Sequence, residues 1–107
     1  MISLSALFAA LAVGCGAFGA HALKSFVSPE MLAVWNTGSH YHLVHSVALV
    51  AMAIGHRSGL TGIVRAWWLL FAGTVWFSGS LYALSLTGTR WLGALTPVGG
   101  LLMLAGW

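Results

Sequence analysis

Three histidines and a tyrosine open the second long apolar segment of the chain, and such side chains can bind a polar ligand, relay protons or ligate a metal ion. His40, Tyr41, His42 and His45 stand just before residues 47–54, which carry no polar side chain. At about 100° per residue, Tyr41, His42 and His45 fall on one face of a helix and His40 points away from it. In lipid each imidazole costs free energy unless it has a partner, so this segment is a candidate functional site.

Composition indicates that lipid surrounds the chain. Hydrophobic residues make up 60% of its 107 residues and charged residues only 5%, whereas a soluble domain carries about a quarter charged residues. The bases are isolated at the ends of apolar segments, which is typical of the positive-inside pattern and excludes a nucleic-acid-binding stripe. The charged residues are Glu30, Lys24, Arg57, Arg65 and Arg90.

Four apolar segments predict an all-α membrane protein, with residues 1–107 forming one domain of four transmembrane helices in an up-down bundle. The predicted spans cover about residues 2–23, 36–55, 66–86 and 92–107. The last of these is short, so we expect it to be truncated. The loop between the second and third spans carries His56, Arg57 and Arg65, which favours a cytoplasmic position for that loop and for both termini.

The second span has a clear start. Ser28 can cap a helix, Pro29 suits its first position, and Glu30 faces the positive end of its dipole. A helix from Pro29 through residue 54 would be longer than the roughly 30 Å hydrocarbon core. We therefore expect a short interfacial helix over residues 29–35, with Trp35 at headgroup level and a bend near Gly38. Thr96-Pro97 resembles a second capped start, at the beginning of the fourth helix.

An up-down arrangement brings the polar ends of these segments to one side of the membrane. The end of the first segment, the start of the second and the end of the third then share one leaflet, which we expect to be the outer one, and the opposite halves are almost purely apolar. This predicts one buried polar cluster. Its residues are His21, Tyr41, His42, His45, Ser78, Ser80 and Tyr82.

Small residues predict close contacts between helices, because they allow the backbones to approach each other. These contacts could lie within the chain or against partner chains. Cys15 is the only cysteine, and it is interpreted as another small packing residue. The predicted packing residues are Ala12, Gly16, Gly19, Ala20, Gly79, Ala83, Gly99 and Gly100.

Several interpretations of the polar cluster stay open. It could be a structural hydrogen-bond network, or a site that binds a ligand or relays protons or ions. His21, His42 and His45 could also hold a metal or haem, although no cysteine or carboxylate supports them. The chain could instead be an accessory or assembly subunit of a larger respiratory or photosynthetic membrane complex. Enzyme chemistry is not expected, because no acid is available to orient a histidine. The sequence identifies no cofactor.

Five short motifs resemble those of the YgdD-type family of small, uncharacterised inner-membrane proteins. The resemblance covers nearly the whole chain, and it implies a four-helix protein of the bacterial inner membrane with no established activity. It also implies a chain that continues past Trp107 into a basic tail, which supports cytoplasmic termini. The motifs are Gly16-Ala-Phe-Gly-Ala-His21, Tyr41 with His45, Phe77-Ser-Gly-Ser-Leu-Tyr82, Thr96-Pro-Val-Gly-Gly100 and Ala105-Gly-Trp107.

Overall fold

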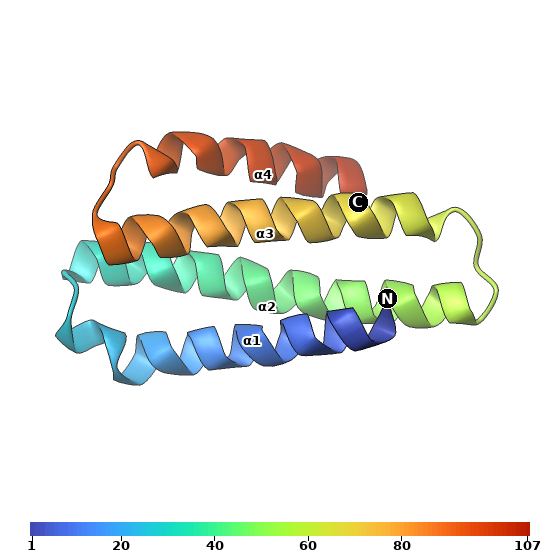
Figure 1. The fold of residues 1–107 in the computed structure, drawn as a ribbon, viewed down its shortest axis with the longest axis horizontal. Helices are drawn as coiled ribbons and strands as arrows, with labels where there is room; N and C mark the ends of the chain where they lie inside the picture. Colours follow the sequence, from blue (N-terminus) through green and yellow to red (C-terminus); the bar gives the residue numbers. More distant parts are fainter.

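The computed structural model describes residues 1–107, which form four α-helices and no β-strand. The helices are α1 (Ile2–His21), α2 (Pro29–Arg57), α3 (Ile63–Thr87) and α4 (Leu92–Gly106), and a 3₁₀ turn, η1 (Leu23–Ser25), follows α1. Consecutive helices run antiparallel, and both termini lie toward the end that holds the α2–α3 loop (Figure 1). The prediction of an all-helical, up-down chain is confirmed.

The helices lie side by side in chain order, so the bundle is flattened and open (Figure 1). Backbones approach each other only between α1 and α2, α2 and α3, and α3 and α4. The molecule measures 47 × 27 × 14 Å along its principal axes. Side chains alone bridge helices that are not consecutive, as where the rings of Phe8 and Phe71 lie 4.9 Å apart between α1 and α3. As a result, α1 and α4 each leave one edge of the bundle uncovered.

Two helical segments are long and apolar enough to cross a membrane, Ile2–Ser25 and Ile63–Thr87. The fourth helix is apolar but has only 15 residues. The second has 29 residues, and its polar side chains are concentrated in its first half.

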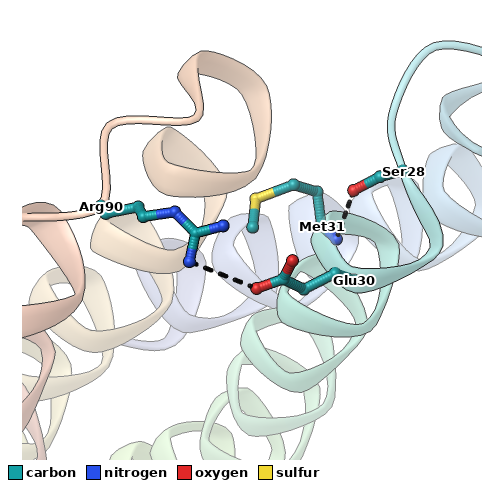
Figure 2. A network of polar contacts seen from close by, with 4 residues as sticks. All are labelled: Ser28, Glu30, Met31 and Arg90. Atoms are coloured by element: carbon teal, nitrogen blue, oxygen red, sulfur yellow. Dashed lines mark hydrogen bonds and ion pairs between the residues drawn. The ribbon is translucent and has the colours of Figure 1, made fainter.

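The start of α2 follows from the capping residues. Ser28 Oγ accepts a hydrogen bond from the backbone N–H of Met31 at 3.2 Å, and Pro29 occupies the first turn. Glu30 lies 3.6 Å from Arg90, so an ion pair links α2 to the α3–α4 loop (Figure 2). Both side chains of this pair are largely exposed, which limits its contribution to about 0–1 kcal/mol.

Loss of the Ser28 cap should therefore lower the free energy of unfolding more than loss of the Glu30–Arg90 ion pair. We expect Ser28→Ala to lower the free energy of unfolding by about 1 kcal/mol, because one orphan N–H of α2 loses its acceptor. Glu30→Gln should have a smaller effect. Detergent-induced unfolding of both variants measures the difference, and a larger loss in Glu30→Gln would contradict this ranking.

The predicted separate interfacial helix does not form, because α2 is continuous from Pro29 to Arg57. Trp35, expected at headgroup level, is buried between helices. Its Nε1–H donates to the Cys15 carbonyl at 2.8 Å, and its ring lies 4.3 Å from that of Tyr82. Gly38 is a contact point: a Cβ there would lie 3.2 Å from Leu81 Cβ. These contacts with α1 and α3 hold residues 29–38 in the helix.

The fourth helix begins at Leu92, at the first residue of the predicted span 92–107, so Thr96-Pro97 is not its capped start. Pro97 lies inside the helix, where it cannot donate the usual backbone hydrogen bond. Thr96 is buried and its Oγ1 lies 2.8 Å from Ser80 Oγ on α3. Trp76 of α3 donates its Nε1–H to the Leu95 carbonyl at 2.9 Å. These contacts fix the first turns of α4 against α3.

The main hydrophobic core lies toward the α2–α3 loop, around the fully buried Trp67. The Trp67 Nε1–H is shared between the Leu49 carbonyl, at 3.0 Å, and Ser5 Oγ, at 3.1 Å. Met103 brings α4 to the same cluster. This one indole therefore links α3 to both α1 and α2.

The predicted small-residue contacts are partly present between α1 and α2. A Cβ at Gly19 would lie 2.6 Å from Trp35 Cδ1, and one at Gly16 would lie 3.3 Å from Ser39 Oγ. Ala12 is buried, whereas Ala20 is exposed.

On α3 and α4, most of the predicted packing residues are not the positions where an added Cβ would meet the neighbouring backbone. A Cβ at Gly99 would lie 2.5 Å from the backbone nitrogen of Phe77, so this prediction fits the structure. Gly79 has no atom within 4 Å, and Gly100 meets only Phe77, at 4.0 Å. Ala83 is half-buried. Gly73 is close to the α4 backbone and was not predicted.

Candidate functional site

The structure does not bring the predicted polar residues into one cluster. Tyr41 and His45 line a groove between α2 and α4, whereas His42, Ser78 and Tyr82 line a separate pocket between α1 and α3. Ser80 pairs with Thr96 between α3 and α4. His21, at the end of α1, is exposed and makes no side-chain hydrogen bond. The residues of the single predicted site are therefore divided between two cavities, and Ser80 and His21 lie outside both.

The first cavity is the α2–α4 groove, with a volume of about 620 Å³. Phe77 of α3 contributes to its lining, Tyr41 and His45 come from α2, and α4 supplies the rest. Leu101 and Leu104 are 67% and 73% exposed, so the groove is open along its α4 side. Its lining residues are Tyr41, His45, Phe77, Pro97, Gly100, Leu101, Met103, Leu104 and Trp107.

Hydrogen bonds indicate the tautomer of His45 in this groove. Its Nδ1 lies 2.8 Å from the carbonyl oxygen of Tyr41, which can only accept, so Nδ1 carries the hydrogen. Nε2 is then the acceptor for the Trp107 Nε1–H, at 3.3 Å. The neutral imidazole is satisfied at both nitrogens. The Tyr41 ring stacks on that of His45 with centroids 5.8 Å apart, and the structure gives its hydroxyl no hydrogen bond within the chain.

The second cavity, the His42 pocket, has a volume of about 190 Å³. His42 is 5% exposed, and its Nδ1 lies 3.1 Å from the Tyr82 hydroxyl. The other ring nitrogen, Nε2, is buried without a hydrogen-bond partner. The pocket is lined by Phe8, His42, Thr74, Val75, Ser78, Gly79 and Tyr82.

Helix α3 separates the two cavities. Phe77 lines the groove, and Val75 and Gly79, two residues away on either side, line the His42 pocket. Two residues correspond to about 200° around a helix, so these side chains point to opposite faces of α3. Tyr41 and His45 therefore line one cavity, and His42 and Tyr82 line the other.

The weak metal candidates do not converge. His21 is exposed at the end of α1, and His42 and His45 line different cavities. The structure forms no group of three His, Cys, Asp or Glu side chains that could hold a metal ion. The three histidines are therefore not placed to share one metal ion or haem.

Sequence reasoning missed several residues that shape the cavities. Trp35, buried against Tyr82, was expected at the membrane surface. Trp35, His42 and Leu49 follow one another at intervals of seven residues. This spacing could have identified the buried face of α2. All three are buried. Phe8 and Phe77, which form cavity walls, carried no such pattern.

Comparison with known proteins places the chain in a family. Residues 15–100 match the family described as "Protein of unknown function (DUF423)". The UPF0382 membrane protein SSP2132 of Staphylococcus saprophyticus is 51% identical over 99% of this chain and 88% of its own length. The UPF0382 membrane protein YwdK of Bacillus subtilis is 48% identical over the same shares.

No solved structure matches the chain. The expected resemblance to an uncharacterised family of membrane proteins is confirmed at that level, with the relatives carrying the UPF0382 name. The family match spans most of the chain and includes every lining residue of the His42 pocket except Phe8, and the groove residues up to Gly100. The chain therefore belongs to the DUF423 family, and its relatives in Bacillus and Staphylococcus are membrane proteins.

Proposed function

We propose that this chain is a four-span protein of the bacterial inner membrane that binds a neutral, apolar-tailed molecule in the α2–α4 groove. One observation carries the proposal: a groove of about 620 Å³ has mostly apolar walls, and its few polar groups are confined to Tyr41, His45 and Trp107. Ligand sites commonly combine such apolar walls with a small number of placed polar groups, in cavities of about 300–1,000 Å³.

The burial pattern of α2 supports its crossing the bilayer despite its polar residues. His42, His45 and Ser46 are buried against neighbouring helices, whereas Leu43, Val44 and Val47 are exposed. Over residues 43–54 the helix therefore turns an apolar surface outward, whereas Asn36, Thr37 and His40 are exposed in its first half. Its 29 residues correspond to about 43 Å, enough to span a core of about 30 Å.

The fourth helix is shorter, at about 22 Å for its 15 residues. Its exposed side chains are apolar and include Val98, Leu101 and Leu104, which suits a lipid-facing position. We place the α2–α3 loop, with Arg57 and Arg65, in the cytoplasm together with both termini.

The ligand class follows from the groove walls. Phe77, Met103 and Leu101 would contact an acyl or prenyl tail. The Tyr41 hydroxyl would donate to a carbonyl or ester oxygen of the head group, because the structure gives this hydroxyl no partner in the chain. No charged side chain lines the groove, so an uncompensated charge on the ligand would be costly there. A quinone or a neutral lipid fits this description.

Quenching of Trp107 fluorescence by decyl-benzoquinone tests the proposal in purified protein reconstituted in lipid nanodiscs. We expect saturable quenching that disappears in Trp107→Phe. Tyr41→Phe should weaken binding roughly twofold to tenfold, the equivalent of about 0.5–1.5 kcal/mol for one hydrogen bond. Gly100→Leu should abolish it, because the new side chain would project into the groove.

Gly79→Leu is the matched control, since Gly79 lies on the opposite face of α3 with no atom within 4 Å of an added Cβ. It should leave quinone quenching unchanged. Quenching that rises without saturation, or that is equal in Gly100→Leu and the unmodified protein, would rule out a site in the groove.

The open edges of the bundle favour a second role, as an accessory subunit of a larger membrane complex. The outer face of α1 exposes Leu7, Leu11 and Val13, and no other helix covers it. Native-gel migration after mild detergent extraction separates the two roles. Migration only with a large complex would favour the accessory role, and migration as a monomer or small oligomer would favour ligand binding by the chain itself.

A further inference from the structure

A third cavity lies between the start of α1 and the last turns of α2, toward the end of the bundle that holds the α2–α3 loop (Figure 1). Its volume is about 550 Å³. Half of its lining residues have polar side chains, in contrast to the mostly apolar walls of the α2–α4 groove. We call this cavity the basic pocket. Its lining residues are Met1, Ile2, Ser3, Ala53, His56 and Arg57.

The positive charge of Arg57 in the basic pocket has no partner within the chain. The only acidic residue is Glu30, which lies in the first turn of α2, at the opposite end of that helix. Glu30 pairs there with Arg90, at 3.6 Å. The guanidinium of Arg57 is therefore exposed with no carboxylate to neutralise it, and an anion from outside the chain is the group that would.

The donors of the basic pocket suit a phosphate group. A guanidinium presents its N–H groups in a fork that matches two phosphate oxygens. The His56 imidazole has at least one N–H to donate, and Ser3 adds a hydroxyl. No side chain caps the start of α1, so its first backbone N–H groups lack acceptors within the helix and also favour an anion.

Apolar side chains continue from the basic pocket toward the middle of the bundle. On α1, Leu7 and Leu11 follow Ser3 at intervals of four residues, which places all three on one face of the helix. On α2, Ile54 lies three residues before Arg57. Leu7, Leu11 and Ile54 are all exposed. A molecule with its phosphate in the pocket would have apolar surface beside it for acyl chains, which a free phosphate ion does not need.

From this arrangement we infer that the basic pocket binds the head group of an anionic phospholipid. The phosphate lies against Arg57, His56 and Ser3, and the acyl chains cover the exposed apolar side chains of α1 and α2. The site does not depend on the α2–α4 groove, because the two cavities share no lining residue.

A specific site differs from the general attraction of arginine to an anionic membrane surface. Arg65 makes this distinction measurable. It lies in the first turn of α3, next to the same loop, but does not line the basic pocket. Arg57 and Arg65 are both exposed, so glutamine at either position removes one charge without disturbing the core. A site requires that the charge at position 57 matter more.

Native mass spectrometry of the whole protein, released from detergent micelles, tests this inference by titration with dioleoyl phosphatidylglycerol. We expect saturable binding of one lipid per chain. Arg57→Gln should weaken that binding by about tenfold or more, because a charge-assisted hydrogen bond is lost. Ser3→Ala should weaken it by roughly twofold to tenfold, as for one neutral hydrogen bond.

Two variants serve as controls. Arg65→Gln removes the same charge outside the basic pocket and should leave the affinity for phosphatidylglycerol nearly unchanged. Gly100→Leu, designed to fill the α2–α4 groove, should also leave it unchanged. A failure of the groove proposal would therefore be seen separately, in the quinone experiment.

The identity of the ligand is tested with two further probes. Dioleoyl phosphatidylcholine, whose phosphate carries its own positive partner, should bind more weakly by about tenfold. Inorganic phosphate, at the concentration of lipid that saturates the site, should not displace phosphatidylglycerol, because it cannot use the apolar surface.

Four results would overturn the inference. Equal losses in Arg57→Gln and Arg65→Gln would show general attraction only, and equal affinities for the two lipids would show that the negative charge is not recognised. Displacement by inorganic phosphate would identify a site for a free anion. Loss of phosphatidylglycerol binding in Gly100→Leu would place the lipid in the groove.

Discussion

Gly99→Ala is expected to destabilise the protein by about 1–3 kcal/mol, the range for overpacking a well-packed contact. The added Cβ would lie 2.5 Å from the backbone nitrogen of Phe77 and 2.8 Å from the Gly73 carbonyl oxygen. Both are backbone atoms, so a side-chain rotation cannot relieve the contact and α4 must move away from α3. This cost outweighs the gain of about 1 kcal/mol that alanine brings to a helix interior.

Gly79→Ala is the matched control because it makes the same chemical change on α3 where nothing lies within 4 Å. It should leave stability unchanged or raise it by up to about 1 kcal/mol through helix propensity. Unfolding of both variants by sodium dodecyl sulfate in mixed micelles gives the two free energies. A Gly99→Ala protein as stable as Gly79→Ala would show that α3 and α4 are not in backbone contact.

Trp67→Ala is expected to lower the free energy of unfolding by about 3–5 kcal/mol, as for other large aromatic side chains removed from a core. The Trp67 side chain is fully buried in the main cluster, and its Nε1–H reaches both Leu49 and Ser5. Its removal leaves a cavity at the junction of three helices. Trp67→Phe retains most of the ring packing and should lose less, because mainly the shared hydrogen bond is gone.

Trp68→Ala is the comparison for the same deletion at a surface. Trp68 is 52% exposed. Trp68→Ala should therefore lower the free energy of unfolding by well under half as much as Trp67→Ala does in the same experiment. Equal losses at the two tryptophans would contradict a core centred on Trp67.

The two destabilising changes also bear on the proposed ligand sites. Gly99 fixes the spacing of α3 and α4, which form two walls of the α2–α4 groove. Trp67 lies in the apolar half of the protein, near the α2–α3 loop, and lines neither cavity. We therefore expect Gly99→Ala to alter quinone binding in protein that remains folded, and a partially destabilised Trp67→Phe to leave it intact.

Composition and local signals determined the helices, their order and the lipid surroundings. A chain with 5% charged residues cannot cover itself with a water-facing surface, and Ser28 and Pro29 identify a helix start by local chemistry alone. Alternation of short loops and long apolar segments then yields an up-down arrangement. The up-down order of the helices also predicts that the polar side chains gather near one end of the bundle.

Only the tertiary structure decided how those side chains are distributed. Because nearly every face of α1, α3 and α4 is apolar, no amphipathic pattern marks the face of these helices that packs against a neighbour. The rotation of α3 is instead decided by close contacts such as that of Gly73 with α4. That rotation places Phe77 on one side and Ser78 and Tyr82 on the other, so His45 and His42 line different cavities. Spacing fixes the direction of a side chain on its own helix, whereas the partner of that side chain depends on how the neighbouring helix is turned.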